Sequence, residues 1–437
     1  MKVLKFGGTS VGSPERMHAV ARLVTGGEKK VVILSAVSGT TNTLVEISSN
    51  LAHNDKNRAE EILKNLEFKY YDFVKGLFST REGVEKGNEI LYDKFSLLKQ
   101  ITAKSFEPAD EKVILAQGEL ISTTLFQAYL EEIKVKSILL PALELMKIDE
   151  DNEPVLSYIE EKFSQALKEN PDYDLYISQG YICRNANGEI DNLKRGGSDY
   201  TASLVGAGIR ASEIQIWTDI DGMHNNDPRI VKNTKPIAEL SFDEAAELAY
   251  FGAKILHPST IWPAQKYSIP VRLLNTMQPD APGTLIANHT SEKAIKAIAA
   301  KDNIIAIKIK SSRMLLAYGF LRKIFEIFEK YKTPIDMITT SEVAVSVTID
   351  NEANLNKIID ELKNYGIVEV DKDQTIVCMV GNMVSETQGI VKNIFDSLGD
   401  IPVRMISYGG SRHNISVLIK TEQKQDALIA LNKGLFD

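Results

Sequence analysis

The chain has 437 residues, 43% hydrophobic and 25% charged, which is typical of a folded protein with two or three domains. Its formal net charge of −8 argues against a nucleic acid or an anionic membrane surface as a partner, because both favour a basic face. Cys183 and Cys378 match no metal-ligand spacing and are typical of reduced thiols. The sequence has no signal region and no apolar run long enough to span a membrane, so we expect a cytoplasmic protein.

Residues 1–290 alternate short apolar runs with longer amphipathic stretches, which predicts an α/β domain. We expect strands at Val3–Phe6, Val31–Leu34, Val135–Leu140, Leu175–Ser178, Ile214–Trp217 and Pro270–Leu274. We expect helices at Pro14–Val24, Ala59–Phe78, Leu120–Glu132, Tyr200–Gly208 and Phe242–Phe251. The Asn-Gly pair within 184–189 predicts a hairpin turn, and the polar stretch 279–293 predicts a domain boundary.

An internal repeat occupies the C-terminal third. Gly319–Phe325 resembles Gly389–Phe395, and Pro334–Thr339 resembles Pro402–Ser407, so two blocks recur in the same order at nearly the same offset. Each copy reads strand, helix, strand, strand, helix. The expected strands are Ile304–Ile309 and Val343–Ile349 in the first copy and Ile376–Val380 and Asn414–Ile419 in the second. The pattern predicts two small α/β domains, at 298–371 and 372–437.

The first segment with candidate chemistry is Lys5-Phe6-Gly7-Gly8-Thr9-Ser10, between a predicted strand and a helix that begins at Ser13 and Pro14. Adjacent glycines let the backbone approach a ligand, and their N–H groups can bind an anion beside the Lys5 charge. Ordinary turns use the same residues. The segment is neither a P-loop nor a dinucleotide fingerprint.

Two further segments can hold a small polar ligand. Leu34–Asn42 places hydroxyls, among them Ser35 and Thr41, directly after a strand, although an ordinary loop that caps the next helix is the more frequent reading. Gln117-Gly118-Glu119 precedes a predicted helix, where the helix dipole favours a carboxylate in any case. In a ligand site, that carboxylate can bind an ammonium group.

The segment 194–201 combines two cations, two glycines and hydroxyls at a strand-to-helix junction. Arg195 can bind a carboxylate through two parallel hydrogen bonds. The alternative is a glycine-rich turn in which Ser198 or Asp199 caps the helix. Two glycine-hydroxyl loops with adjacent cations favour a ligand site over chance.

The last candidate segments are typical of nucleotide contacts. Trp217-Thr218-Asp219 ends a predicted strand, and Asp219 can accept hydrogen bonds from a ribose. Arg229 follows shortly and can lie near phosphates. In Phe251-Gly252-Ala253-Lys254 the lysine stands at a helix end, where the dipole also favours it.

Taken in order, these motifs resemble the aspartate kinase family within the amino-acid kinase fold. The matching segments are Lys-Phe-Gly-Gly-Thr-Ser, Leu-Ser-Ala-Val-Ser-Gly-Thr-Thr-Asn, Gln-Gly-Glu, Arg-Gly-Gly-Ser-Asp, Trp-Thr-Asp and Phe-Gly-Ala-Lys-Ile-Leu-His-Pro. The repeats resemble that family's tandem ACT domains. The resemblance implies a three-layer αβα kinase domain at 1–290 followed by two ferredoxin-like ACT domains, in a monofunctional, lysine-sensitive enzyme.

The resemblance also implies residue roles. Catalysis is assigned to Lys5 and Asp199. The aspartate pocket comprises Ser35, Thr41, Glu119, Arg195 and Ser198. The ATP pocket comprises Lys5, Gly7, Gly8, Thr218, Asp219, His224, Arg229 and Lys254. Effector contacts comprise Met314, Asp336, Ser341 and Glu342. His224 departs from the family, since several relatives have a tyrosine there, near the adenine.

We expect Mg²⁺ to enter with the phosphates of ATP, lysine to be the first candidate effector, and the assembly to be a dimer or a dimer of dimers. The substrate carboxylate is ionised at neutral pH, so the reaction needs no general base. Asp199 then orients Lys5 or the substrate. The alternatives are a kinase of the same fold for glutamate, acetylglutamate or a nucleotide, and a non-catalytic amino-acid sensor. A dinucleotide-dependent dehydrogenase lacks its phosphate fingerprint.

Overall fold

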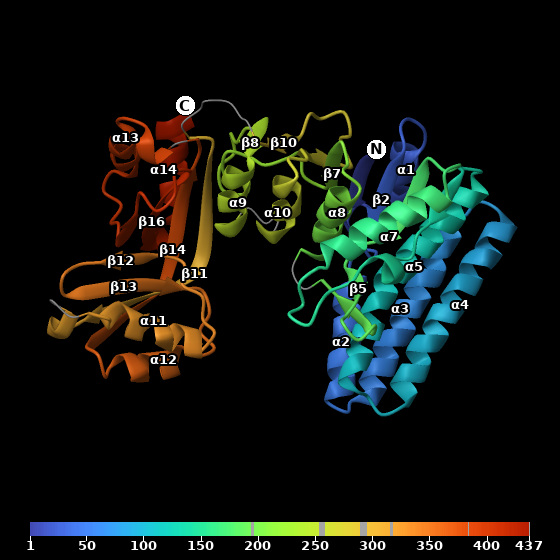
Figure 1. Cartoon of the computed structure of the whole chain (residues 1–437), viewed down its shortest axis with the longest axis horizontal. Helices are drawn as coiled ribbons and strands as arrows, with labels where there is room; N and C mark the ends of the chain where they lie inside the picture. Colours follow the sequence, from blue (N-terminus) through green and yellow to red (C-terminus); the bar gives the residue numbers. More distant parts are fainter. Residues whose placement is uncertain (194–195, 253–257, 289–294, 315–317, 383, 437) are drawn as a thin grey trace. The chain divides into compact units, whose positions relative to one another are not determined.

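The computed structural model describes residues 1–437 apart from 194–195, 253–257, 289–294, 315–317, 383 and 437 (Figure 1). The chain divides into two compact units. Unit 1 comprises 1–223, 238–242 and 256–289, and unit 2 comprises 224–237, 243–255 and 290–437. None of the described helices is both long and apolar enough to cross a membrane.

Unit 1 contains an eight-stranded sheet in the order β3-β4-β2-β1-β7-β9-β10-β8. The strands are β1 (Lys2–Phe6), β2 (Lys30–Leu34), β3 (Ser137–Leu139), β4 (Leu175–Gln179), β7 (Glu213–Thr218), β8 (Glu239–Ser241), β9 (Val271–Asn275) and β10 (Thr284–Ala287). Neighbours from β3 to β9 run parallel, and β10 is antiparallel to β9. Every residue of β2 and β4 is buried, as expected of parallel strands covered on both faces. The six strands predicted for this region are therefore present.

The helices of unit 1 are α1 (Pro14–Val24), α2 (Thr40–Ala52), α3 (Lys56–Leu77), α4 (Arg81–Ala103), α5 (Pro108–Glu132), α6 (Ala142–Leu145), α7 (Leu156–Glu169), α8 (Gly197–Gly208) and α10 (Pro258–Lys266). Helix α1 has its predicted bounds, because Ser13 accepts a hydrogen bond from the Arg16 N–H and proline occupies the first turn. In Figure 1, α3, α4 and α5 run alongside one another. Their apolar faces form one core with the sheet, which includes Leu34 and Phe95.

Helix α5 differs from the prediction. It begins at Pro108 rather than Leu120, because a capping box between Glu107 and Asp110 starts the helix there. Glu119 therefore lies in the middle of a helix and not at its N-terminus, so the predicted dipole effect on this carboxylate is wrong.

The hairpin predicted within 184–189 is confirmed. It joins β5 (Ile182–Arg184) to β6 (Ile190–Asn192), and Gly188 adopts φ +83° in the turn. The segment follows β4 directly and lies in unit 1.

Unit 2 contains a six-stranded antiparallel sheet in the order β12-β13-β11-β14-β16-β15. The strands are β11 (Ala297–Lys310), β12 (Ile338–Thr340), β13 (Ala344–Ile349), β14 (Ile367–Val380), β15 (Met405–Ser407) and β16 (Asn414–Lys420). The helices are α9 (Phe242–Tyr250, of which all but the first residue belongs to unit 2), α11 (Phe320–Lys330), α12 (Leu355–Leu362), α13 (Ile390–Leu398) and α14 (Lys424–Phe436). Both repeat helices, α11 and α13, follow a glycine of positive φ, Gly319 and Gly389.

The two repeat copies have separate cores but share their two longest strands. Residues 305–310 of β11 pair with β13, and residues 306–310 also pair with the first part of β14, around one apolar cluster. Residues 297–301 of β11 pair with 376–380 of β14 instead, and Ile298 belongs to the other cluster. The first five residues of β11 thus complete the second copy, and the first copy begins near 304 rather than 298.

Two segments within the predicted kinase region, 224–237 and 243–255, belong to unit 2. The Ile298 N–H donates to the Asn225 carbonyl at 2.8 Å, and the Asn226 amide donates to the Leu428 carbonyl at 3.0 Å. Val231 is part of the core of the second copy. These contacts tie the segment 224–237 to the second copy.

Candidate active site

The site lies at the carboxyl ends of the parallel strands of unit 1. Strand β1 lies between β2, which follows it in the chain, and the much later β7, so the strand order reverses at β1. In open α/β sheets, ligands bind at such a switch point. The loops are held together there: the Ser35 N–H donates to the Phe6 carbonyl at 3.2 Å and the Gly7 N–H to the Trp217 carbonyl at 3.3 Å.

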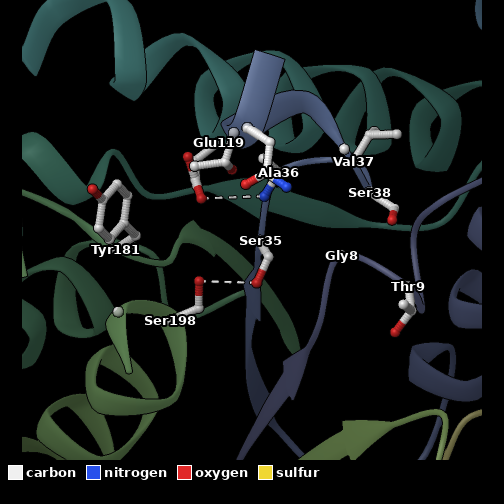
Figure 2. Close-up of a pocket in the computed structure, with 13 residues that line it drawn as sticks. Gly8, Thr9, Ser35, Ala36, Val37, Ser38, Glu119, Tyr181 and Ser198 are labelled. Carbon is white, nitrogen blue, oxygen red and sulfur yellow. Dashed lines mark hydrogen bonds between the residues drawn. The ribbon is translucent and has the colours of Figure 1, made fainter. Parts of the chain in front are cut away.

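A cavity of about 450 Å³ opens at this edge (Figure 2). It is lined by Gly8, Thr9, Ser35, Ala36, Val37, Ser38, Gly39, Thr41, Asn42, Glu119, Tyr181, Gly197 and Ser198. This volume is in the range of small-molecule sites. The first four candidate segments of the sequence therefore meet around one space, although they extend along the chain from Gly8 to Ser198.

Glu119 provides a buried negative charge at the cavity. The residue is 3% exposed, and its Oε1 accepts a hydrogen bond from the Ala36 N–H at 3.3 Å (Figure 2). No described residue donates to Oε2. Burial raises the pKa of Glu119 to about 7, against the smaller opposing effect of the hydrogen bonds and of the Lys5 charge. A cation that donates hydrogen bonds, such as an ammonium group, would satisfy both the charge and the free oxygen.

Lys5 and Asp199 form an ion pair in the same unit. The Lys5 Nζ lies 2.7 Å from Asp199 Oδ1, and the two side chains are only 12% and 16% exposed. Gly8 of the first loop is needed for space, since a Cβ there would lie 2.9 Å from the Ala36 carbonyl oxygen. Asp199 thus holds the Lys5 ammonium beside a loop whose backbone can approach a ligand closely.

A hydroxyl after β2 and one from the first turn of α8 complete the polar lining. The Ser35 hydroxyl donates to the Ser198 hydroxyl at 2.9 Å (Figure 2). The Ser122 hydroxyl donates to the Ser35 carbonyl at 2.8 Å. Helix α8 is capped by Gly196, with φ +67°, so neither Ser198 nor Asp199 is the N-cap. Neither side chain is therefore engaged in capping the helix. In the same way Gly39, and not Thr41 or Asn42, caps α2, and both of those residues line the cavity.

Tyr181 is a lining residue that the sequence patterns did not identify. Its backbone adopts φ +66°, unusual for a tyrosine, and a Cβ on Gly197 would lie 2.5 Å from the ring. The Tyr181 N–H donates to the Thr201 hydroxyl at 3.0 Å, which holds this conformation. Burial raises the pKa of Tyr181 to about 12, so its hydroxyl is neutral. The only sequence signal was Gly180, which leaves room for Ser198.

The predicted nucleotide contacts are divided between the units. Thr218 ends β7 in unit 1, and its hydroxyl donates to Asp219 Oδ1 at 3.2 Å. His224 and Arg229 belong to unit 2, where the Arg229 guanidinium binds both oxygens of Asp227 at 2.9 and 2.7 Å. Arg195 and Lys254 lie outside the described residues.

The predicted effector contacts lie in unit 2. Asp336 is bound to Lys301 and to Tyr250. Met314 packs against the core of the first copy. Ser341 and Glu342 lie between β12 and β13, and the Glu342 side chain is exposed.

Comparison with known proteins identifies the two regions. The amino acid kinase family matches residues 1–275, and an ACT domain matches residues 377–435. Lysine-sensitive aspartokinase 3 of Escherichia coli K12 is 33% identical over all of this chain and 99% of its own length. The chloroplastic aspartokinase 3 of Arabidopsis thaliana is also 33% identical, over 100% of this chain and 81% of its own.

Solved structures agree with these sequence relatives. Aspartokinase III of E. coli with aspartate and ADP, in the R-state, superposes with a TM-score of 0.84 over 100% of both chains. The T-state of that enzyme with lysine and aspartate gives a TM-score of 0.80 over the same coverage, and both share 33% identity with this chain. This chain therefore belongs to the aspartokinase family, with an amino acid kinase domain followed by an ACT regulatory region.

Proposed function

We propose that this chain transfers the γ-phosphoryl group of ATP to the β-carboxylate of L-aspartate, forming 4-phospho-L-aspartate and ADP for amino-acid biosynthesis. The observation that supports this best is the buried Glu119, with one oxygen free, in a cavity at the carboxyl ends of the strands. An amino acid that donates its ammonium group to Oε2 fits this site. The relatives named aspartokinase, and the one solved with aspartate and ADP, support aspartate as that amino acid.

The aspartate is held by complementary charges. Glu119 binds its α-ammonium together with the hydroxyls of Ser35 and Ser198, while Thr41 borders the same space. Arg195 binds its α-carboxylate with two parallel hydrogen bonds, in a role that rests on the family motif. The β-carboxylate is then free to act as the nucleophile. Because a carboxylate of ordinary pKa about 3.9 is ionised at neutral pH, no general base is required.

Phosphoryl transfer depends on neutralising the charge between two anions. Lys5 and the N–H group of Gly8 stabilise the transferred phosphoryl group, and Asp199 orients the Lys5 ammonium through their ion pair of 2.7 Å. Gly7, whose N–H donates to the Trp217 carbonyl, holds the loop in place beside them. Mg²⁺ enters with the phosphates of ATP as part of that substrate. Thr218 and Asp219 bind the nucleotide, and the corresponding roles of His224, Arg229 and Lys254 rest on the resemblance alone.

Regulation belongs to the ACT region. We assign the effector contacts to Met314, Asp336, Ser341 and Glu342, with lysine as the effector, since a relative solved with lysine is similar over the whole chain. An effector inhibits only if it binds an inactive state better than the active one. We further propose a homodimer or a dimer of dimers. The domain limits we propose are 1–290 for the kinase domain, about 304–371 for the first ACT domain in place of 298–371, and 372–437 together with 297–301 for the second.

One assay tests the reaction and its regulation together. ADP release from ATP and Mg²⁺ is measured with aspartate, with and without millimolar lysine, while hydroxylamine traps the acyl phosphate. Turnover that requires aspartate and falls with lysine supports both assignments. Turnover insensitive to lysine supports the kinase and contradicts lysine as effector. Turnover with glutamate but not with aspartate contradicts the proposed substrate.

A further inference from the structure

Asp336 is already occupied by groups of the chain itself. Its side chain is 2% exposed, and Oδ1 lies 2.7 Å from the Lys301 Nζ and 2.5 Å from the Tyr250 hydroxyl. Lys301 also pairs with Asp350 at 3.0 Å, and its Nζ lies 4.5 Å from the centre of the Tyr250 ring. No described residue donates to the second oxygen, Oδ2. Asp336 therefore has one neutralised oxygen and one that can still accept a hydrogen bond.

The repeat contains the same contact with the charges exchanged. At the offsets that relate the two matched blocks, Asp371 is the counterpart of Lys301, and Arg404 is the counterpart of Asp336. Arg404 and Asp371 also form an ion pair, but their side chains are 50% and 45% exposed. An ion pair between these two positions is thus a general feature of both copies. A buried acidic group is specific to the first copy.

The difference in burial determines whether each ion pair can open without a large cost in free energy. An exposed ion pair contributes little to stability and can open freely in water. A buried carboxylate that loses its cation is strongly destabilised, so Asp336 must have a positive partner at all times. Lys301 supplies that partner. An incoming ammonium group can meet Oδ2 and then replace Lys301 without leaving the charge uncompensated.

Tyr250 links Asp336 to a conspicuous motif of the predicted kinase region. It is the last residue of α9, and Gly252 follows it two residues later. Gly252, with φ +124°, packs so closely on β11 that a Cβ would lie 2.3 Å from the Ala300 carbonyl oxygen, next to Lys301. The motif Phe-Gly-Ala-Lys begins at this point. The contact of Tyr250 with Asp336 therefore ties the end of α9 to β11 just before this motif.

We propose that Lys301 and Tyr250 are internal ligands of Asp336, and that the ammonium group of an amino-acid effector binds there by displacing them, which frees α9. This proposal rests on the assignment of Asp336 to the effector site made above. The hydrogen bond from Tyr250 to Asp336 must break before the effector ammonium can take its place. It therefore opposes effector binding, and by linkage the bound effector opposes that hydrogen bond equally.

Tyr250→Phe tests the proposal most directly, because it removes the hydroxyl and keeps the ring beside Lys301. We expect lysine to bind the full-length variant about tenfold more tightly in calorimetry, and to half-inhibit ADP release at an about tenfold lower concentration. Arg404→Met is the matched control, since it removes the exposed pair at the same position of the second copy. It should leave both values unchanged.

The outcomes separate this inference from the proposed reaction. Equal lysine affinity in wild type and Tyr250→Phe, with normal aspartate-dependent turnover, overturns the inference and leaves the reaction intact. Tighter lysine binding without aspartate-dependent turnover supports the inference and contradicts the reaction. No lysine binding to the wild type overturns the inference, as does an equal change in Arg404→Met. Lys301→Met, which leaves Asp336 with Tyr250 alone, should also bind lysine more tightly if it folds.

Discussion

Two buried carboxylates, Glu119 in unit 1 and Asp336 in unit 2, differ in whether a cation of the chain neutralises them. The residue Glu119 is 3% exposed and the Asp336 side chain 2%, and no described residue donates to the second oxygen of either. Glu119 has only a backbone N–H at 3.3 Å, whereas Asp336 has a lysine and a tyrosine hydroxyl. A cation that binds Glu119 Oε2 displaces no described partner, so it gains the attraction of the carboxylate without breaking an existing ion pair. A ligand of Asp336 gains only the difference between itself and Lys301, which suits a site that must respond to concentration.

Replacing Lys5 by alanine should have the largest effect on the substrate side. Lys5 is assigned to the transferred phosphoryl group, so its loss should lower kcat by about 10²–10³-fold with little change in the KM for aspartate. Steady-state kinetics of ADP release measure both constants. An increase confined to KM would contradict this role and would place Lys5 in ground-state binding.

Glu119→Gln removes the free charge and keeps the shape of the side chain. We expect the KM for aspartate to rise by about 10–100-fold, since a charge-assisted hydrogen bond to the ammonium group becomes a neutral one. Glu111→Gln, on the exposed face of the same helix, is the control and should not change KM. An unchanged KM in Glu119→Gln would remove this residue from the aspartate pocket.

The pH dependence of aspartate binding should reveal the titration of Glu119. Burial raises the pKa of Glu119 to about 7, so the carboxylate is ionised above that pH and protonated below it. The KM for aspartate should therefore rise about tenfold between pH 8 and pH 6, as the charge that attracts the ammonium is lost. In Glu119→Gln the dependence should disappear in this range. A flat profile in the wild type would show that another group neutralises Glu119.

Glu342→Ala should have the smallest effect, on the effector side. Its side chain is exposed, so its contact with an effector is screened by water, and we expect the half-inhibitory lysine concentration to rise about two- to fivefold. Glu329→Ala on α11 is exposed in the same copy and serves as the control. Equal inhibition of the wild type and Glu342→Ala would remove Glu342 from the effector site.

Local signals predicted much of the fold. Ser13 and Pro14 defined the start of α1, and the apolar runs located the strands that meet at the cavity. The start of α5 was not predicted, because the expected helix began after Gln117-Gly118-Glu119, whereas the capping residues lie at Glu107 and Asp110. Helix α4 was missed as well.

The parts of the site that escaped prediction depend on tertiary contacts. Tyr181 borders the cavity because Gly197 and Thr201, which follow it in the next helix, hold its unusual backbone conformation. The occupation of Asp336 by Tyr250 joins residues 86 positions apart. No periodicity or spacing in the sequence indicates either contact. The motifs predicted which residues are chemically able to act, but not which of them are free to do so.

The two long strands of unit 2 have a consequence for how the chain is synthesised. Each long strand contributes one half to each copy. The strand that completes the second copy, residues 297–301, is therefore synthesised before the rest of it, so the second copy is a circular permutation of the first. Residues 304–371 can close into a structure as soon as they leave the ribosome. Residues 297–301 cannot form their strand pairing until 376–380 have emerged. A fragment that begins after residue 303 would lack an edge strand of the second copy, so the copies cannot be separated by a single cut between them.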